Sequence, residues 1–187
     1  MADIYDKNIL EFATVAVEYC AFVTQASEFS KIEFIDKSQK MLSLLYLKAS
    51  MLPDASEDDL DGYLEQFVTE LEWQSVQDAV SAVIGRHDTY FDATDPQNSL
   101  TGETYTACLS ECYADIYQDI KNFTSRYRLG EEEIMRLAIA DCVITFRTIW
   151  GSRLLSVLSE LHLLRYCGED LSDDEGSVSY NNYENLF

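Results

Sequence analysis

The chain has 187 residues, of which 47% are hydrophobic and 12% aromatic, and its formal net charge is −21. This hydrophobic content is enough to form a packed core and excludes disorder over most of the length. The 34 acidic and 13 basic residues exclude the nucleic-acid-binding class and disfavour anionic membrane surfaces, because both kinds of binding depend on Lys and Arg. We expect helices joined by few connections, since seven Gly and two Pro are few for the turns of a sheet-rich fold.

The cysteines and the N-terminus together predict a cytoplasmic protein. The cysteines are odd in number and lie in or at the end of apolar stretches, as is typical of reduced, buried thiols: Cys20, Cys108, Cys112, Cys142 and Cys167. The N-terminus is acidic and lacks the basic and apolar regions of a signal peptide. No uncharged apolar stretch approaches the length of about 20 residues that crosses a bilayer.

Apolar residues three and four positions apart predict two N-terminal helices. The first is capped by Asp3 or Asp6 and runs to about Ser27. The second begins with a capping box at residues 30–33 and runs to about residue 52, where Pro53 ends it. Its expected buried face includes these residues: Ile32, Ile35, Leu42, Leu45, Tyr46 and Ala49.

An acidic segment precedes the third predicted helix. Residues 49–85 hold nine acidic residues and no basic one. A second capping box at residues 69–72 predicts a short helix that ends at Gly85.

Two longer helices are predicted in the C-terminal half. An apolar stripe alternating four and three positions apart predicts a helix over residues 101–128, which Gly130 ends. A last helix follows to about Tyr166 and includes Ile149 and Leu155 among its expected core residues. Gly151 in its middle marks a kink or a place where another backbone comes close.

The predicted fold class is therefore all-α, a compact bundle of about five main helices with a long last helix. We expect residues 1–168 to form one helical domain. Residues 169–187 hold six acidic residues and no basic one, and are expected to be a flexible acidic tail.

Two regions carry the candidate binding residues. The connection after the third helix places Arg86, His87, Asp88 and Tyr90 beside Phe91, which is a site-like group of charged and aromatic side chains. Its alternative role is structural, with the aromatic residues anchoring the loop and Asp88 acting as a cap or pairing with Arg86.

The second region is the helix face formed by Glu111, Asp115 and Asp119 at successive turns. Such a face binds a cation or a basic side chain, is simply solvated, or pairs with arginines such as Arg147 and Arg153. For Trp150 and His162 on the last helix there are two alternatives. They either contact a ligand, or they are residues of the core and of its rim.

No catalytic, metal or cofactor site is predicted. The sequence has no Gly-rich phosphate loop, nucleophile elbow or HExxH zinc motif, and no Glu-x-x-His pair of the di-metal bundles. The acidic segment is not an EF-hand, because Asp59 occupies the position that requires glycine.

Several short segments resemble the bacterial domain of unknown function 5063 family. They are Glu72-Trp73, residues 85–91, residues 114–121, and residues 146–162 around Trp150-Gly151. The resemblance covers about residues 8–167 and implies a compact helical domain. It brings no activity, cofactor or catalytic residue. The positions it marks as shared are Asp88, Tyr90, Asp115, Tyr117, Asp119, Trp150 and Gly151.

The sequence thus predicts a cytoplasmic interaction or regulatory module, rather than an enzyme, whose acidic surface binds a basic protein. The alternative is a small-molecule or metal-binding enzyme. Its site would lie near residues 86–91 and the face formed by Glu111, Asp115 and Asp119.

Overall fold

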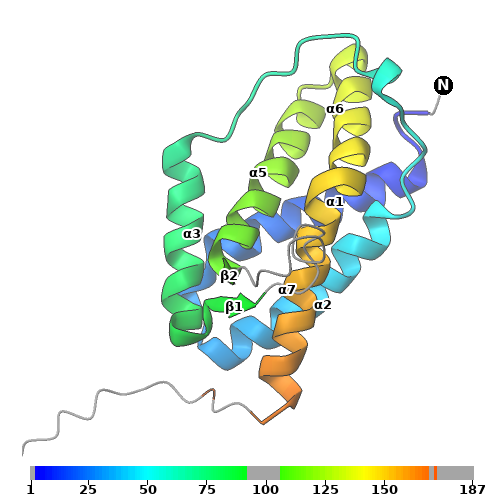
Figure 1. Cartoon of the computed structure of the whole chain (residues 1–187). Helices are drawn as coiled ribbons and strands as arrows, with labels where there is room; N and C mark the ends of the chain where they lie inside the picture. The colour runs from blue at the N-terminus through cyan, green and yellow to red at the C-terminus, as the bar shows by residue number, and fades with distance from the viewer. Residues whose placement is uncertain (1–2, 92–105, 169–170, 172–187) are drawn as a thin grey trace, which may run out of the picture.

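A computed structural model of the chain describes residues 3–91, 106–168 and 171. Its helices form two layers (Figure 1). One layer contains α3 (Glu70–Ile84) beside α5 (Leu109–Arg128), and next to α5 a long helix made of α6 (Glu132–Thr145) and α7 (Gly151–Tyr166) end to end. Behind it cross α1 (Lys7–Thr24) and α2 (Lys31–Ala49). This arrangement confirms the prediction of an all-α bundle.

The starts of three helices are fixed by caps close in sequence. Ser30 and Thr69 each begin a helix with a complete capping box, formed with Glu33 and Glu72 respectively. Asp6 caps α1 by accepting a hydrogen bond from the N–H of Asn8 at 2.8 Å. These caps satisfy backbone N–H groups that have no partner inside the helix. The predicted ends of α1 and α2 lie about three residues too far along the chain, whereas the predicted ends at Gly85, Arg128 and Tyr166 agree with the structure.

The start of α5 differs from the prediction. The helix begins at Leu109 rather than near residue 101, and Thr106–Cys108 form strand β2 instead. This strand pairs antiparallel with β1 (Thr89–Phe91), and Phe91 lies opposite Thr106. The apolar stripe identified the helix correctly but carried no signal for where it starts.

The last helix contains a π-helical segment at its midpoint. Residues Phe146–Trp150 form this segment, marked η4, between α6 and α7. The N–H of Gly151 donates to the carbonyl of Phe146, and a Cβ on Gly151 would lie 2.3 Å from that oxygen. The oxygen beside Gly151 belongs to the same helix, so the structure shows a π-helical segment here rather than the predicted approach of another backbone.

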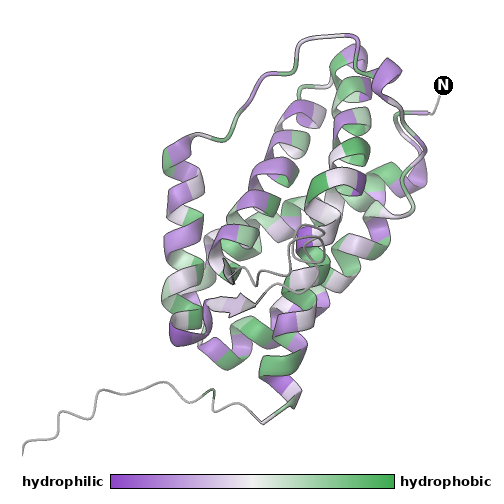
Figure 2. Ribbon diagram, in the orientation of Figure 1, coloured by the Kyte–Doolittle hydropathy of each residue, from purple (hydrophilic) through white to green (hydrophobic). Residues whose placement is uncertain are grey.

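The hydrophobic core lies between the two layers. Figure 2 shows hydrophobic residues recurring along each helix between hydrophilic ones. Some expected core residues lie at the surface, because the helices carry apolar residues over more of their circumference than their neighbours cover. Ile32, Ile149 and Leu155 are 47%, 42% and 45% exposed.

Candidate functional site

In the loop after α3, Asp88 makes hydrogen bonds that join the end of α3 to the start of α5. Asp88 accepts hydrogen bonds from the N–H and the hydroxyl of Ser110, both at 2.7 Å, and from the hydroxyl of Ser81 at 3.0 Å. Its carbonyl accepts from the N–H of Leu109 at 2.8 Å. Asp88 therefore caps α5 from outside that helix, and both of its carboxylate oxygens are engaged.

The other residues of this loop divide between surface and interior. Arg86 donates to the ring of His87 at 3.3 Å in an exposed contact. Tyr90 is buried, and its hydroxyl lies 3.7 Å from the sulfur of Cys112. The backbone of Phe91 is part of β1, and nothing further is described for its side chain. The structural reading of Asp88 and Tyr90 thus has direct contacts in its favour.

Asp115 joins three helices. It accepts a hydrogen bond from the indole N–H of Trp73 on α3 at 3.0 Å and forms an ion pair with Arg153 on α7 at 2.7 Å. The prediction that this acidic helix face pairs with arginines is confirmed for Asp115 and Arg153. Arg147 instead pairs with Asp54. Glu111 is exposed and is not part of this group.

Asp119 is a half-buried carboxyl group one turn further along α5. Among the described residues it forms no hydrogen bond or ion pair, although Asp115–Arg153 and Asp141 are close enough to affect its ionisation. Burial, and next the charge of Asp141, raise the pKa of Asp119 to about 6, against the opposing effects of Arg153 and Arg126. Asp119 is thus a carboxyl group that takes up a proton in mildly acidic solution.

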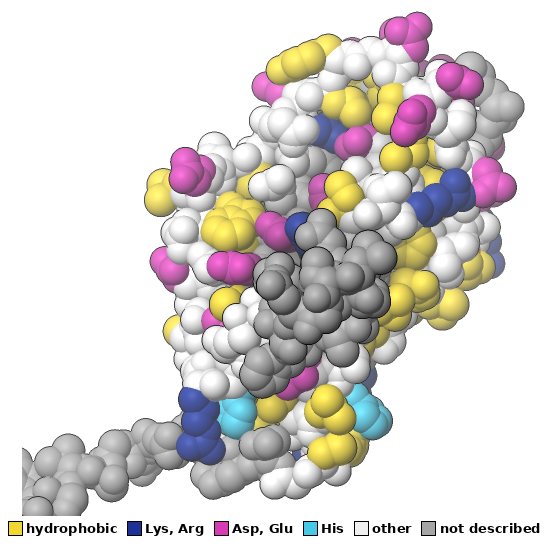
Figure 3. All heavy atoms as spheres, viewed as in Figure 1, with side chains coloured by type: hydrophobic (Ala, Val, Ile, Leu, Met, Phe, Trp, Pro, Cys, Tyr) yellow, Lys and Arg dark blue, Asp and Glu magenta, His cyan; other side chains and the backbone are white. Residues whose placement is uncertain are grey.

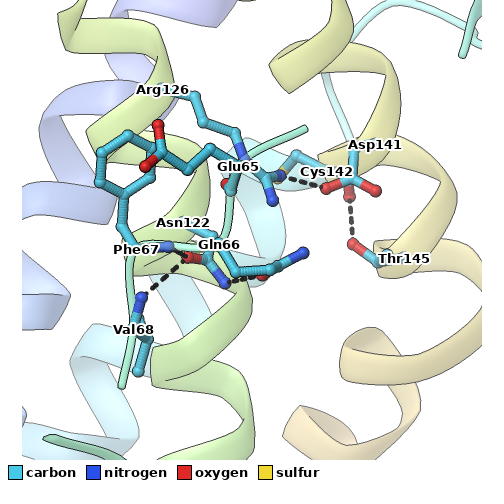
Figure 4. Close-up of polar contacts among 9 residues, drawn as sticks. All are labelled: Glu65, Gln66, Phe67, Val68, Asn122, Arg126, Asp141, Cys142 and Thr145. Atoms are coloured by element: carbon cyan, nitrogen blue, oxygen red, sulfur yellow. Dashed lines mark hydrogen bonds and ion pairs between the residues drawn. The ribbon is translucent and has the colours of Figure 1, made fainter. Parts of the chain in front are cut away.

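Arg126 and Asn122 are central polar residues that sequence reasoning missed (Figure 4). Arg126 is only 1% exposed; it pairs with Asp141 at 2.6 Å and donates to the carbonyl of Glu65 at 2.8 Å. The side-chain oxygen of Asn122 accepts from the N–H groups of Phe67 and Val68, at 2.7 and 3.1 Å. Together they hold the extended segment before α3 against α5, and no pattern in the sequence identified them.

Trp150 is a core residue. It is fully buried and packs against the rings of Phe12 and Phe146, with centroids 6.4 and 4.7 Å away. The predicted site residues therefore fall into three places: the α5 cap, the Asp115–Asp119 face, and the core. We find no support in these contacts for a single site that unites them.

An acidic cavity of about 440 Å³ lies between the segment after α2 and helix α6. Its wall carries five carboxylates and one guanidinium: Asp54, Asp58, Asp59, Asp61, Glu133 and Arg136. Apolar side chains complete it: Ile4, Pro53, Ala55, Leu137, Ile139 and Ala140. Figure 3 shows acidic side chains spread over this end of the molecule, where α6 begins.

Two of these carboxylates hold the cavity wall in place. Asp54 pairs with Arg147, which also donates to the carbonyl of Ala55 at 3.1 Å. Asp59 accepts from the N–H of Ser56 at 2.8 Å, and this bond lowers the pKa of Asp59. Asp58, Asp61 and Glu133 form no ion pair or hydrogen bond with the described part of the chain.

The described residues include no group of three or more His, Cys, Asp or Glu side chains arranged to hold a metal ion. All five cysteines are free thiols. Within the same residues, no helix combines the length and hydrophobicity needed to span a membrane. Of the expected tail, only Leu171 is described, and it is buried; the rest of residues 169–187 lies outside the described residues.

Comparison with known proteins places the chain in a family. Residues 3–167 match the family model described as domain of unknown function DUF5063. The crystal structure of protein BF1032 from Bacteroides fragilis, a structural genomics target, is 35% identical, with a TM-score of 0.77 over 89% of this chain and 97% of that one. No curated protein matches. The chain is therefore a member of the domain of unknown function 5063 family, as its motifs indicated.

Proposed function

We propose that this protein is an interaction module that binds a basic segment of a partner protein in the acidic cavity between the segment after α2 and α6. The observation that carries the proposal is the composition of that cavity. It combines apolar side chains with three carboxylates that no described residue pairs with, Asp58, Asp61 and Glu133, and has one basic residue, Arg136.

A Lys or Arg side chain matches this composition, because it has a long apolar stem and a charged end. The stem would pack on Leu137 and Ile139, which line the cavity. The charged end would reach Asp58, Asp61 or Glu133, which no cation of the described chain occupies. The net charge of −21 would also attract a basic partner and increase its association rate at low salt.

The test uses a fluorescein-labelled peptide of alternating arginine and leucine, with a glutamine–leucine peptide as the uncharged comparison. Fluorescence anisotropy would give Kd for the native protein and for the double variant Asp58→Asn/Asp61→Asn. The matched control is Glu18→Gln/Glu28→Gln, which removes the same charge from exposed positions outside the cavity.

We expect the cavity variant to weaken binding about tenfold, which corresponds to about 1.4 kcal/mol, and the control to change it less than about twofold. Binding should also weaken as salt rises from about 0.05 to 0.5 M, because screening shortens the range of the interaction. Equal losses of peptide affinity in both variants would show that the affinity depends only on the net charge. That result would reject the cavity as the binding site.

A further inference from the structure

A second cavity, of about 500 Å³, lies in a groove between α1 and α5, where the two helices cross. Its lining is mostly apolar or uncharged, and its two charged residues are both basic, Lys121 and Arg128. None of the acidic residues that the structure describes is part of it. The groove is thus opposite in character to the acidic cavity.

The two basic side chains of this groove lack the partners that other basic residues have. All 13 Lys and Arg residues are described, and seven of them are seen in ion pairs with carboxylates. Lys37 and Arg165 lie over aromatic rings. For Lys121 and Arg128 the described structure shows no ion pair, hydrogen bond or ring contact, although the charge of Lys121 is close enough to Glu72 to help lower the pKa of that carboxyl group. In a chain with so many carboxylates, two unpaired cations in one groove indicate a site for an external anion.

The geometry of α5 orients both cations toward the same groove. Lys121 and Arg128 are seven residues apart, which places them on one helix face about 10.5 Å apart along the axis. Between and opposite them are the small apolar side chains of Ala13, Val17 and Ala21. A ligand lying along the groove would therefore contact apolar surface with its body and a cation with its anionic group.

The neutral polar groups of the lining narrow the kind of ligand. The hydroxyls of Thr24 and Thr124 donate to carbonyls of their own helices, and that of Tyr127 donates to the carbonyl of Ile4. Burial raises the pKa of Cys20 to about 12, so this thiol stays neutral and behaves as an apolar group. The charged donors that the lining offers to a ligand are Lys121 and Arg128, which suits an anionic group.

We infer that the α1–α5 groove binds an amphipathic anion, a carboxylate or phosphate carried on an elongated apolar body. The volume lies within the range of small-molecule sites, and such sites are mostly apolar with a few placed polar groups. The net negative charge of the chain opposes the approach of an anion. That opposition is limited at physiological ionic strength, where charges further than about 8 Å away are largely screened. Among residues 3–91, 106–168 and 171, no carboxylate lines the groove.

The primary test uses 8-anilinonaphthalene-1-sulfonate as the probe, since it is an anion on an aromatic body. Its Kd would be measured by fluorescence for the native protein, for Lys121→Gln/Arg128→Gln, and for the control Lys40→Gln/Arg165→Gln, which removes the same charges elsewhere. We expect the groove variant to weaken binding at least about tenfold and the control to leave it within about twofold. Circular dichroism would verify cooperative unfolding of each variant, because this probe also binds partly folded states.

Competition then defines the anion. Dodecanoate and dodecyl phosphate are expected to displace the probe, whereas acetate and inorganic phosphate at the same concentration are not. Ala21→Trp, which fills the groove without changing charge, should also abolish binding. Unchanged binding in the groove variant, or displacement by phosphate as effective as by dodecyl phosphate, would overturn the inference. Neither result bears on peptide binding at the acidic cavity.

Discussion

The hydroxyl of Tyr127 donates a hydrogen bond of 2.7 Å to the backbone carbonyl of Ile4, across 123 positions of the sequence. Tyr127 lines the α1–α5 groove and Ile4 lines the acidic cavity. One bond therefore joins the walls of the two cavities and fixes the chain before α1 to the end of α5.

Replacement of Tyr127 by Phe should lower the free energy of unfolding by about 1 kcal/mol, because one partly buried hydrogen bond is lost without a change in packing. Urea denaturation followed by circular dichroism would measure the change. Tyr63→Phe is the control, since Tyr63 is 88% exposed. Equal effects of the two replacements would show that the Tyr127–Ile4 bond adds no stability.

Asp119 should make stability depend on pH. Its pKa of about 6 in the folded state lies above the value of about 3.9 expected in the unfolded chain. The folded state therefore binds the proton more tightly, and this contribution to stability is complete below about pH 4 and is lost as pH rises through 6. Relative to the wild type, Asp119→Asn should gain about 1–3 kcal/mol at pH 7 and nothing near pH 4.

Guanidinium denaturation of both proteins at several pH values between 4 and 8 would measure this difference. Subtracting the two curves removes the contributions of all other titrating groups. Glu57→Gln, a change of the same kind at an exposed position, is the control. A pH-independent difference for Asp119→Asn would contradict the raised pKa.

Asp88→Ala should destabilise the fold by about 2 kcal/mol, because the N–H and hydroxyl of Ser110 would both lose their acceptor. Ser110→Ala removes the hydroxyl alone and should cost less. The double variant should cost less than the sum of the two single changes, because they disrupt one shared interaction. Additive losses, measured by urea denaturation, would argue against a coupled cap.

Gly151→Ala should destabilise the protein, although alanine is ordinarily the better helix residue by about 1 kcal/mol. The new Cβ would lie 2.3 Å from the carbonyl oxygen of Phe146, so backbone would have to move. We expect a loss of about 1–3 kcal/mol, as for other overpacked interiors. Ser152→Ala, one position later, should be close to neutral. Thermal unfolding of both variants would distinguish a steric effect at 151 from a general intolerance of that helix.

Asn122→Ala should release the segment before α3. The N–H groups of Phe67 and Val68 would lose their acceptor, and the backbone there would open more often. Limited digestion with chymotrypsin should then show faster cleavage after Phe67. Gln118→Ala, at an exposed position of the same helix, is the control and should digest like the wild type.

Local signals in the sequence predicted the starts of α1, α2 and α3 well. The capping boxes at Ser30 and Thr69 depend on residues three positions apart, and both form as expected. Asp88 shows the limit of such signals. It does act as a cap, but the helix that it caps begins after β2, and nothing near Asp88 in the sequence identifies that helix.

The polar contacts of α5 could not have been predicted in the same way. Arg126 and Asn122 bind backbone groups of residues 65–68, and a backbone group leaves no residue pattern by which to recognise it. The two cavities were missed for a related reason. Each depends on how two distant segments pack, whereas the sequence shows only the charge that each segment carries.

The pairing of Phe91 with Thr106 has a consequence for how this fold tolerates change. The end of β1 and the start of β2 are paired neighbours, and Asp88, which precedes β1, is hydrogen-bonded to Ser110 at the start of α5. The number of residues inserted between these points therefore alters loop-closure entropy only slowly. Relatives that differ in the number of residues between these points would therefore keep the pairing of β1 with β2, because that pairing and the Asp88 cap lie outside the residues that differ.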